Sequence, residues 1–277
     1  MANSCFVQTN GLRLHYLDYG NENAPVLVCI HGLTGNAHNF DAVAPHLARS
    51  YHVLSLDVRG RGDSDWGPPE TYSYTQYASD LAGVLDTLGV GSASLLGTSM
   101  GGIISMIYAA GHPHRVERLA LNDIGPELDP AGIERIVQYV STAPLEFRDL
   151  DEVADYYVGT YPIMAGIPRP SLLEFCRSTA KQIDSGRWVW KMDPAVRRPP
   201  PAGASTRLPD LWGAYCKVEA PVLVIRGSES DLLSPATVER MRAVHDKTRV
   251  VEVPGVGHAP FLTEPEALAG LKEFFGC

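Results

Sequence analysis

A serine flanked by glycines, within residues 96–102 (L-G-T-S-M-G-G), constrains the fold of this chain more than any other feature. An apolar run at residues 93–96 leads into it, and a stretch of small, helix-compatible residues at 103–110 follows it. A strand that turns so sharply into a helix strains the backbone of its central residue, and side chains two residues away would crowd the turn. Ser99 is therefore predicted to raise its hydroxyl above the end of a sheet, beside a helix N-terminus.

Apolar runs and helical stretches alternate along much of the chain. Strands are predicted at residues 26–30, 53–58, 93–96, 119–121, 222–225 and 250–253. Helices are predicted at residues 74–88, from Ser234-Pro235 onward, and at residues 263–275. Asn10-Gly11 predicts the turn of an N-terminal hairpin. This alternation predicts an α/β fold with a mostly parallel central sheet flanked by helices.

The alternation stops between about residues 124 and 212, where no convincing buried strand is found. Helices are predicted there instead, beginning at Asp129-Pro130 and lying near residues 150–158 and 171–183. Three prolines at 199–201 with Gly203 predict an irregular return segment. We expect a core domain of residues 1–123 and 213–277, with residues 124–212 inserted as a helical cap over the sheet.

Composition narrows the classes of partner. A formal net charge of −9 argues against nucleic acid and anionic membranes, because both bind clustered Lys and Arg. No signal peptide or membrane-spanning stretch is evident. The five cysteines form no C-x-x-C pair, and free thiols in a reducing compartment explain them most simply. We expect a cytoplasmic protein that acts on a small molecule; the sequence leaves the oligomeric state open.

A serine hydroxyl becomes a good nucleophile only when a base takes its proton and a third group holds that base. His258 follows the predicted strand at 250–253, and Asp231 follows the strand at 222–225. Ser99, Asp231 and His258 thus occur in the order nucleophile, acid and base, each just past a strand. The sequence predicts that these three residues carry catalysis.

Further motifs resemble those of the α/β-hydrolase superfamily over nearly the whole chain. Residues 31–35 (H-G-L-T-G) are similar to the H-G-x-x-G oxyanion-hole loop after the third strand of that family. Residues 57–64 (D-V-R-G-R-G-D-S) are close to its D-x-R-G-x-G-x-S segment. With the serine turn and the two later loops, five motifs stand in the family's order. The chain therefore resembles a capped member of this superfamily with a serine nucleophile.

Three carboxylates compete for the role of the catalytic acid. Glu229 lies two residues before Asp231 in the same loop. Asp123 ends the strand after the helix that follows Ser99, where some family members keep their acid. Asp231 is preferred, because its spacing after a strand matches the commoner arrangement in the family.

The resemblance also implies how the rest of the site is built. It assigns the oxyanion hole to the backbone N–H groups of Leu33 and Met100. His31 is expected to organise its loop rather than to catalyse, and residues 57–64 are expected to brace the site as a hydrogen-bonded turn. The chain has no dinucleotide or P-loop motif and no zinc-ligand spacing, so neither a cofactor nor a metal is predicted.

These residues predict acyl transfer through an acyl-enzyme intermediate. A serine at the turn excludes the dehalogenases and epoxide hydrolases of this fold, which carry Asp there. Hydrolysis of a carboxylic ester is the leading interpretation. Hydrolysis of a C–C bond in ring-fission β-diketones is the alternative, although residues 33–36 (L-T-G-N) depart from the G-P-G pattern usual in those enzymes. Lactone or amide hydrolysis, and a small-molecule receptor on the same fold, stay open.

The insertion is expected to supply the substrate pocket, because it is rich in aromatic residues. The predicted substrate-binding residues are Trp188, Trp190, Tyr157 and Trp212. The alternative for each aromatic residue is a place in the core of the insertion itself or in its seam with the sheet. The cations of this region are expected to be solvated surface charges rather than receptors for a substrate carboxylate; they are Arg177, Lys181, Arg187 and Lys191.

Overall fold

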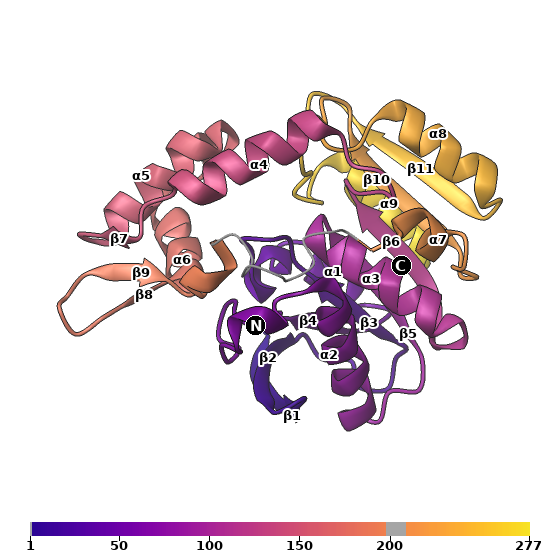
Figure 1. Ribbon diagram of the computed structural model, residues 1–277, viewed down its shortest axis with the longest axis horizontal. Coiled ribbons are helices and arrows are strands. Elements are labelled where there is room, and N and C mark those ends of the chain that lie inside the picture. The colour runs from indigo at the N-terminus through magenta and orange to yellow at the C-terminus, as the bar shows by residue number, and fades with distance from the viewer. Residues whose placement is uncertain (1, 198–208) are drawn as a thin grey trace.

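An eight-stranded sheet forms the centre of the computed structural model, which describes residues 2–197 and 209–277 (Figure 1). The strand order is β1-β2-β4-β3-β5-β6-β10-β11. The strands are β1 (Asn3–Thr9), β2 (Leu12–Asp18), β3 (Val26–Ile30), β4 (His52–Leu56), β5 (Ala93–Thr98), β6 (Val116–Asn122), β10 (Val222–Gly227) and β11 (Thr248–Val253). From β4 to β11 the neighbours are parallel, whereas β1 and β2 are antiparallel to each other and β2 to β4. The predicted mostly parallel sheet is confirmed.

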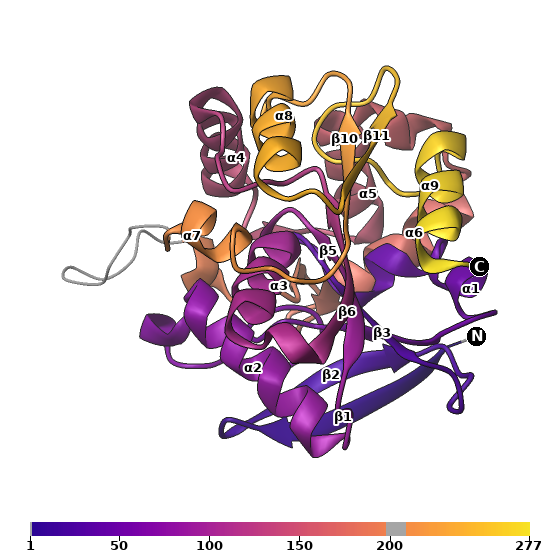
Figure 2. The same ribbon diagram turned by 90° about the vertical axis from the view of Figure 1, so that its right-hand side faces the viewer.

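Helices cover both faces of this sheet, which explains why its central strands are continuous apolar runs. One face carries α2 (Tyr74–Thr87), α3 (Met100–Gly111), α7 (Leu211–Tyr215) and α8 (Pro235–Val244), and the other carries α1 (Ala44–Leu47) and α9 (Pro265–Phe275) (Figure 2). A separate apolar cluster fills each layer: Leu81 and Ile104 belong to the first, and Leu47 and Phe274 to the second. The central strands β3, β4, β5 and β10 are therefore buried on both sides, whereas β1 at the edge is largely exposed.

Short sequence signals set the ends of several elements. Asn10 and Gly11 take φ angles of 48° and 75° and form the turn of the predicted β1–β2 hairpin. The Ser234 hydroxyl accepts a hydrogen bond from the Thr237 N–H at the start of α8. The Asp129 side chain accepts one from the Ala131 N–H at the start of α4 (Pro130–Thr142). These turn and capping predictions are confirmed.

The chain leaves the sheet after β6 and returns at β10. Between them lie α4, α5 (Leu150–Thr160) and α6 (Arg169–Thr179), which agree with the predicted helices (Figure 1). A small antiparallel sheet was not expected there; its order is β7 (Glu146–Phe147), β9 (Trp188–Trp190), β8 (Ala180–Gln182). The predicted helix at 171–183 ends at Thr179 because β8 begins at the next residue. The proline-rich segment at 199–203 lies outside the described residues.

The inserted elements have an apolar cluster of their own, to which Phe147, Val153 and Leu172 belong. Helix α4 approaches the loop after β10 closely at Gly132, where an added Cβ would meet the backbone of Asp231 and Leu232. All five cysteines are free. Among the described helices, none has the length and apolar character needed to cross a membrane.

Candidate active site

Ser99 lies on the sharp turn between β5 and α3, with φ of 50° and ψ of −115°. Non-glycine residues rarely adopt such angles. A Cβ on Gly97 would collide with the backbone carbonyl of Gly101, and a Cβ on Gly101 would collide with the carbonyl of Ile30. The glycines therefore let the turn pack against β3, and the predicted strained conformation is confirmed.

His258 connects Ser99 to a buried carboxylate. Its Nε2 lies 2.9 Å from Ser99 Oγ, and its Nδ1 lies 2.8 Å from Asp123 Oδ2. The His258 side chain is nearly buried, and that of Asp123 is fully buried. A hydroxyl, an imidazole and a carboxylate thus form one hydrogen-bonded path.

The carboxylate of Asp123 is held by the loop that follows β10. Its Oδ1 accepts a hydrogen bond from the Gly227 N–H over 2.9 Å, and its Oδ2 accepts one from the Ser230 hydroxyl over 2.6 Å. Asp123 itself has a φ of 53°, and its N–H donates to the Ile225 carbonyl of β10. These contacts fix the direction in which Asp123 presents its second oxygen to His258.

Asp231, the predicted acid, is not the residue that contacts His258. Its carboxylate forms a bidentate ion pair with Arg135 of α4, over 2.5 and 2.8 Å. The Arg135 guanidinium holds the pKa of Asp231 below its usual range. Neighbouring side chains of this loop point in different directions. The Ser230 side chain turns toward Asp123, whereas the Asp231 side chain points to α4 and away from His258. Nor does Glu229 hydrogen-bond to His258 among the described residues.

The predicted oxyanion donors lie beside the serine. A Cβ placed on Gly32 would come within 3.6 Å of Ser99 Cβ, so the loop of residues 31–35 lies against the turn. Within the described part of the chain, the N–H groups of Leu33 and Met100 donate no hydrogen bond. The buried Arg61 supports both residues, since its Nε donates to the Leu33 carbonyl and its Nη2 lies 3.4 Å from Met100 Sδ. Among the described residues these two N–H groups have no acceptor; one follows Ser99 directly in the chain, and the other lies in the loop that packs against it.

His31 and Asp57 organise the surrounding loops, as predicted. His31 Nε2 accepts a hydrogen bond from the Val58 N–H over 3.1 Å. Burial lowers the pKa of His31 to about 4, so its ring is neutral near pH 7. Asp57 accepts hydrogen bonds from the N–H groups of Ala37 and Asp63. Residues 57–64 thus brace the loop beside Ser99.

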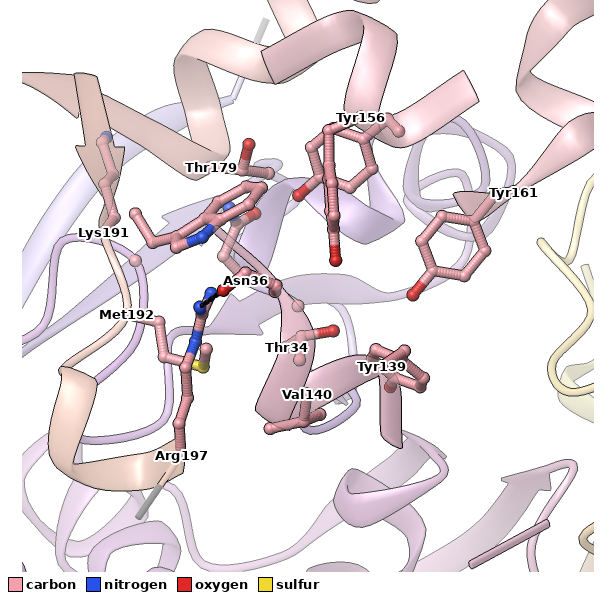
Figure 3. A pocket seen from close by; sticks show the side chains of 15 residues that line it. Thr34, Asn36, Tyr139, Val140, Tyr156, Tyr161, Thr179, Lys191, Met192 and Arg197 are labelled. Carbon is pink, nitrogen blue, oxygen red and sulfur yellow. Dashed lines mark hydrogen bonds between the residues drawn. The ribbon is translucent and has the colours of Figure 1, made fainter. Parts of the chain in front are cut away.

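A cavity opens between the loop of residues 31–35 and the insertion (Figure 3). Thr34 and Gly35 line it from the core. Several of the insertion residues that line it are aromatic, namely Tyr139, Tyr156, Tyr157, Tyr161 and Trp190. Tyr157 and Trp190 are two of the predicted substrate-binding residues. Both also belong to or pack against the apolar cluster of the insertion, so their role in binding stays a prediction.

The other two predicted tryptophans do not line this cavity. Trp188 belongs to β9 and packs in the apolar cluster of the insertion. Trp212 belongs to α7; its indole N–H donates to Glu127 over 3.1 Å, and the Arg240 guanidinium stacks on its ring. Both are better explained by packing than by binding, which is the alternative that the sequence had left open.

Lys191 is not the solvated surface charge that was expected, whereas Arg177 and Lys181 are exposed, as expected. Lys191 lines the cavity, but its Nζ lies 2.9 Å from Asp63 Oδ2, so a carboxylate of the core already neutralises it. Arg187 is 42% exposed and pairs with Glu146.

Two functional candidates were not predicted from the sequence, namely Ser230 and the cavity residue Arg197. Neither belongs to a motif, and only their place in space distinguishes them.

A sequence model of the family described as the alpha/beta hydrolase fold matches residues 25–265. The chain belongs to the α/β-hydrolase family. This α/β hydrolase is 37% identical over 273 residues to the 3-hydroxybutyrate-oligomer hydrolase of Cupriavidus necator, a match that covers 95% of this chain and 92% of the relative. It is 30% identical over 245 residues to the 2-(acetamidomethylene)succinate hydrolase of Mesorhizobium japonicum, covering 88% and 85% of the two chains.

Solved structures agree with this assignment. The crystal structure of an α/β hydrolase from Novosphingobium aromaticivorans matches with a TM-score of 0.87 at 34% identity, covering 99% of this chain and 98% of the other. The predicted superfamily, fold class and general enzyme class, a hydrolase, are confirmed.

Proposed function

We propose that this α/β hydrolase is a serine carboxylic ester hydrolase in which Ser99, His258 and Asp123 form the catalytic triad. The hydrogen-bonded path through these residues carries the proposal, since neither of its two contacts exceeds 2.9 Å. A base within hydrogen-bond distance of a hydroxyl can take its proton, and a buried carboxylate can hold the ring in the correct tautomer.

The geometry supports a sequence of two acyl transfers. Ser99 Oγ attacks the ester carbonyl while His258 Nε2 takes the hydroxyl proton, and the N–H groups of Leu33 and Met100 stabilise the oxyanion. His258 returns the proton to the leaving alcohol, and the acyl group stays on Ser99. His258 then takes a proton from water, which attacks the acyl-enzyme carbonyl. The acid leaves as His258 returns the proton to Ser99 Oγ. Asp123 stabilises the imidazolium in both steps.

Two observations favour an ester over other bonds. The Cupriavidus necator relative is named for the hydrolysis of 3-hydroxybutyrate oligomers, and the units of a hydroxy-acid oligomer are joined through esters. The oxyanion loop also departs from the G-P-G pattern that is usual in C–C hydrolases of this fold, since residues 33–36 read L-T-G-N. These two observations are why we propose an ester as the bond that is hydrolysed.

We also propose that residues 124–212 act as the substrate-binding cap of a core built from residues 1–123 and 213–277. The described strands of the main sheet all come from the two flanking segments, and the insertion has its own apolar cluster. The cavity between the insertion and the loop of residues 31–35 supports its role in binding. Its aromatic walls suit a substrate with apolar parts.

The test compares wild type with Ser99→Ala on 4-nitrophenyl esters, a lactone and a ring-fission diketone. We expect ester hydrolysis by wild type and a loss of kcat of about 10⁴-fold or more in the variant, because the nucleophile is gone. A fluorophosphonate should label wild type on Ser99, as read by mass spectrometry of the labelled peptide. Rapid diketone cleavage with negligible ester turnover, or no adduct on Ser99, would overturn the proposal.

A further inference from the structure

Arg197 brings a positive charge to the cavity between the insertion and the oxyanion loop. It ends the short turn after β9, and its side chain is one of those that line the cavity in Figure 3. Its Nη1 donates to the carbonyl oxygens of Ala143 and Pro144 over 3.2 and 3.3 Å. The guanidinium carbon lies 5.4 Å from the centre of the Trp190 ring. Backbone oxygens and an aromatic ring thus hold this side chain in place.

Two other cations described near the cavity are already neutralised by carboxylates. Lys191 pairs with Asp63, and Arg135 pairs with Asp231 through two hydrogen bonds. Among the described residues, no carboxylate lies within ion-pair distance of Arg197, and none of those lining the cavity is acidic. Among the described residues that line the cavity, Arg197 is therefore the cation without a carboxylate partner, although the chain as a whole has a formal net charge of −9.

A half-buried guanidinium without a counter-ion is costly, because carbonyl dipoles replace only part of its hydration. The desolvation also lowers the pKa of Arg197. Arg has five N–H donors in a planar fork that matches a carboxylate, and only Nη1 has partners among the described residues. Within the described part of the chain, the Nε and Nη2 donors have no acceptor and can serve a ligand. A single carboxylate on a ligand would neutralise the charge of Arg197.

We propose that Arg197 binds a free carboxylate of the substrate, so that the preferred substrates are esters of acids that carry a second, distant carboxylate. This inference rests on the proposed function, because it places the ester carbonyl at the oxyanion loop. Thr34 and Gly35 of that loop and Arg197 line the same cavity. Ser99 and His258 do not line the cavity, so a substrate would extend from the oxyanion loop into it, with its acid end at Arg197 and its apolar chain against the tyrosines.

The test uses mono-(4-nitrophenyl) esters of adipate, suberate and sebacate, each paired with the neutral 4-nitrophenyl ester of the acid of equal length: hexanoate, octanoate and decanoate. In wild type, kcat/KM should favour the acidic ester for at least one length. Arg197→Met should lower that preference by roughly 10- to 100-fold, the range for hydrogen bonds to a charged group. The neutral esters should change by no more than about threefold. Arg197→Lys should restore part of the preference, because it keeps the charge but not the fork.

The matched control is Arg187→Met, an exposed arginine of the insertion that lies outside the cavity lining and should leave both kinds of ester unaffected. Circular dichroism and melting temperature verify that each variant folds. An absence of acid preference at every length in wild type, or an equal fall for acidic and neutral esters in both Arg197 variants, would overturn the inference.

A binding measurement separates this inference from the proposed catalysis. Suberate should bind to Ser99→Ala in titration calorimetry and should bind at least about 10-fold more weakly when Arg197→Met is added. Equal binding by the single and double variants would count against the carboxylate site. If instead the neutral esters were hydrolysed equally by wild type and Ser99→Ala, the proposed function would fail while the binding result still decided the role of Arg197.

Discussion

Strands β6 and β10 are neighbours in the sheet, and each is followed by an aspartate with a different task. Asp123, after β6, is fully buried and contacts His258, Gly227 and Ser230. Asp231, after β10, is 35% exposed and binds Arg135 of the insertion. The first carboxylate connects two parts of the core, and the second ties the insertion to the core.

The difference shows that a position just after a strand does not decide which carboxylate contacts His258. A buried carboxylate with fixed donors has one orientation and a strong local field, which is what a histidine base requires. An exposed carboxylate paired with a surface arginine is screened by water and contributes little. We therefore expect the two aspartates to respond very differently to the same substitution.

The largest contrast should come from Asp123→Asn against Asp231→Asn. Asp123→Asn should lower kcat by about 10³- to 10⁴-fold, because an amide holds the ring in the wrong tautomer and does not stabilise imidazolium. Asp231→Asn should change kcat by no more than about threefold. Steady-state kinetics on a 4-nitrophenyl ester measures both. A larger fall for the Asp231 variant would reverse the assignment of the acid.

A smaller effect should follow removal of the hydroxyl that holds Asp123. Ser230→Ala should lower kcat by about tenfold with little change in KM, since one hydrogen bond to the carboxylate is lost and two contacts remain. Ser230→Thr keeps the hydroxyl and should recover most of the rate. The melting temperature reports any general loss of stability. An equal fall in both variants would indicate a packing role for Ser230 instead.

The smallest effect should be on stability, at the second aspartate. Asp231→Asn should lower the free energy of unfolding by about 1 kcal/mol or less at neutral pH, because the ion pair is partly exposed. The pKa of Asp231 is depressed in the folded protein, so the contribution is present above its unfolded value and is lost as pH falls through the folded one.

Urea unfolding of wild type and Asp231→Asn gives this difference as a function of pH. It should be constant from pH 7 down to about pH 4 and shrink below that. A difference that grew on acidification would mean that the carboxylate of Asp231 is destabilised by its surroundings rather than held by Arg135.

The main sheet and the serine turn could be predicted because their signals are local. A β-branched apolar run indicates a buried strand, and the glycines around Ser99 fit only a crowded, strained turn. Both features depend on residues that follow one another in the chain. For the same reason, the capped starts of α4 and α8 were predictable.

The choice of acid could not be made in the same way. Asp123 and Asp231 both follow strands, and their roles depend on where Ser230 and Arg135 direct them in space. The strands β7–β9 are two or three residues long, too short to show a period in the sequence. Arg197 resembles the other cations of the insertion until the cavity around it is known.

The pairing of β6 with β10 has a consequence for how the enzyme folds. It joins Leu119 to Val222 across the whole insertion, so the chain must close a long loop before this part of the sheet exists. Ser99 and Asp123 precede that loop, whereas His258 and the groups that hold Asp123 follow it. During refolding, recovery of hydrolase activity should therefore coincide with this late closure and lag behind the secondary structure seen by circular dichroism.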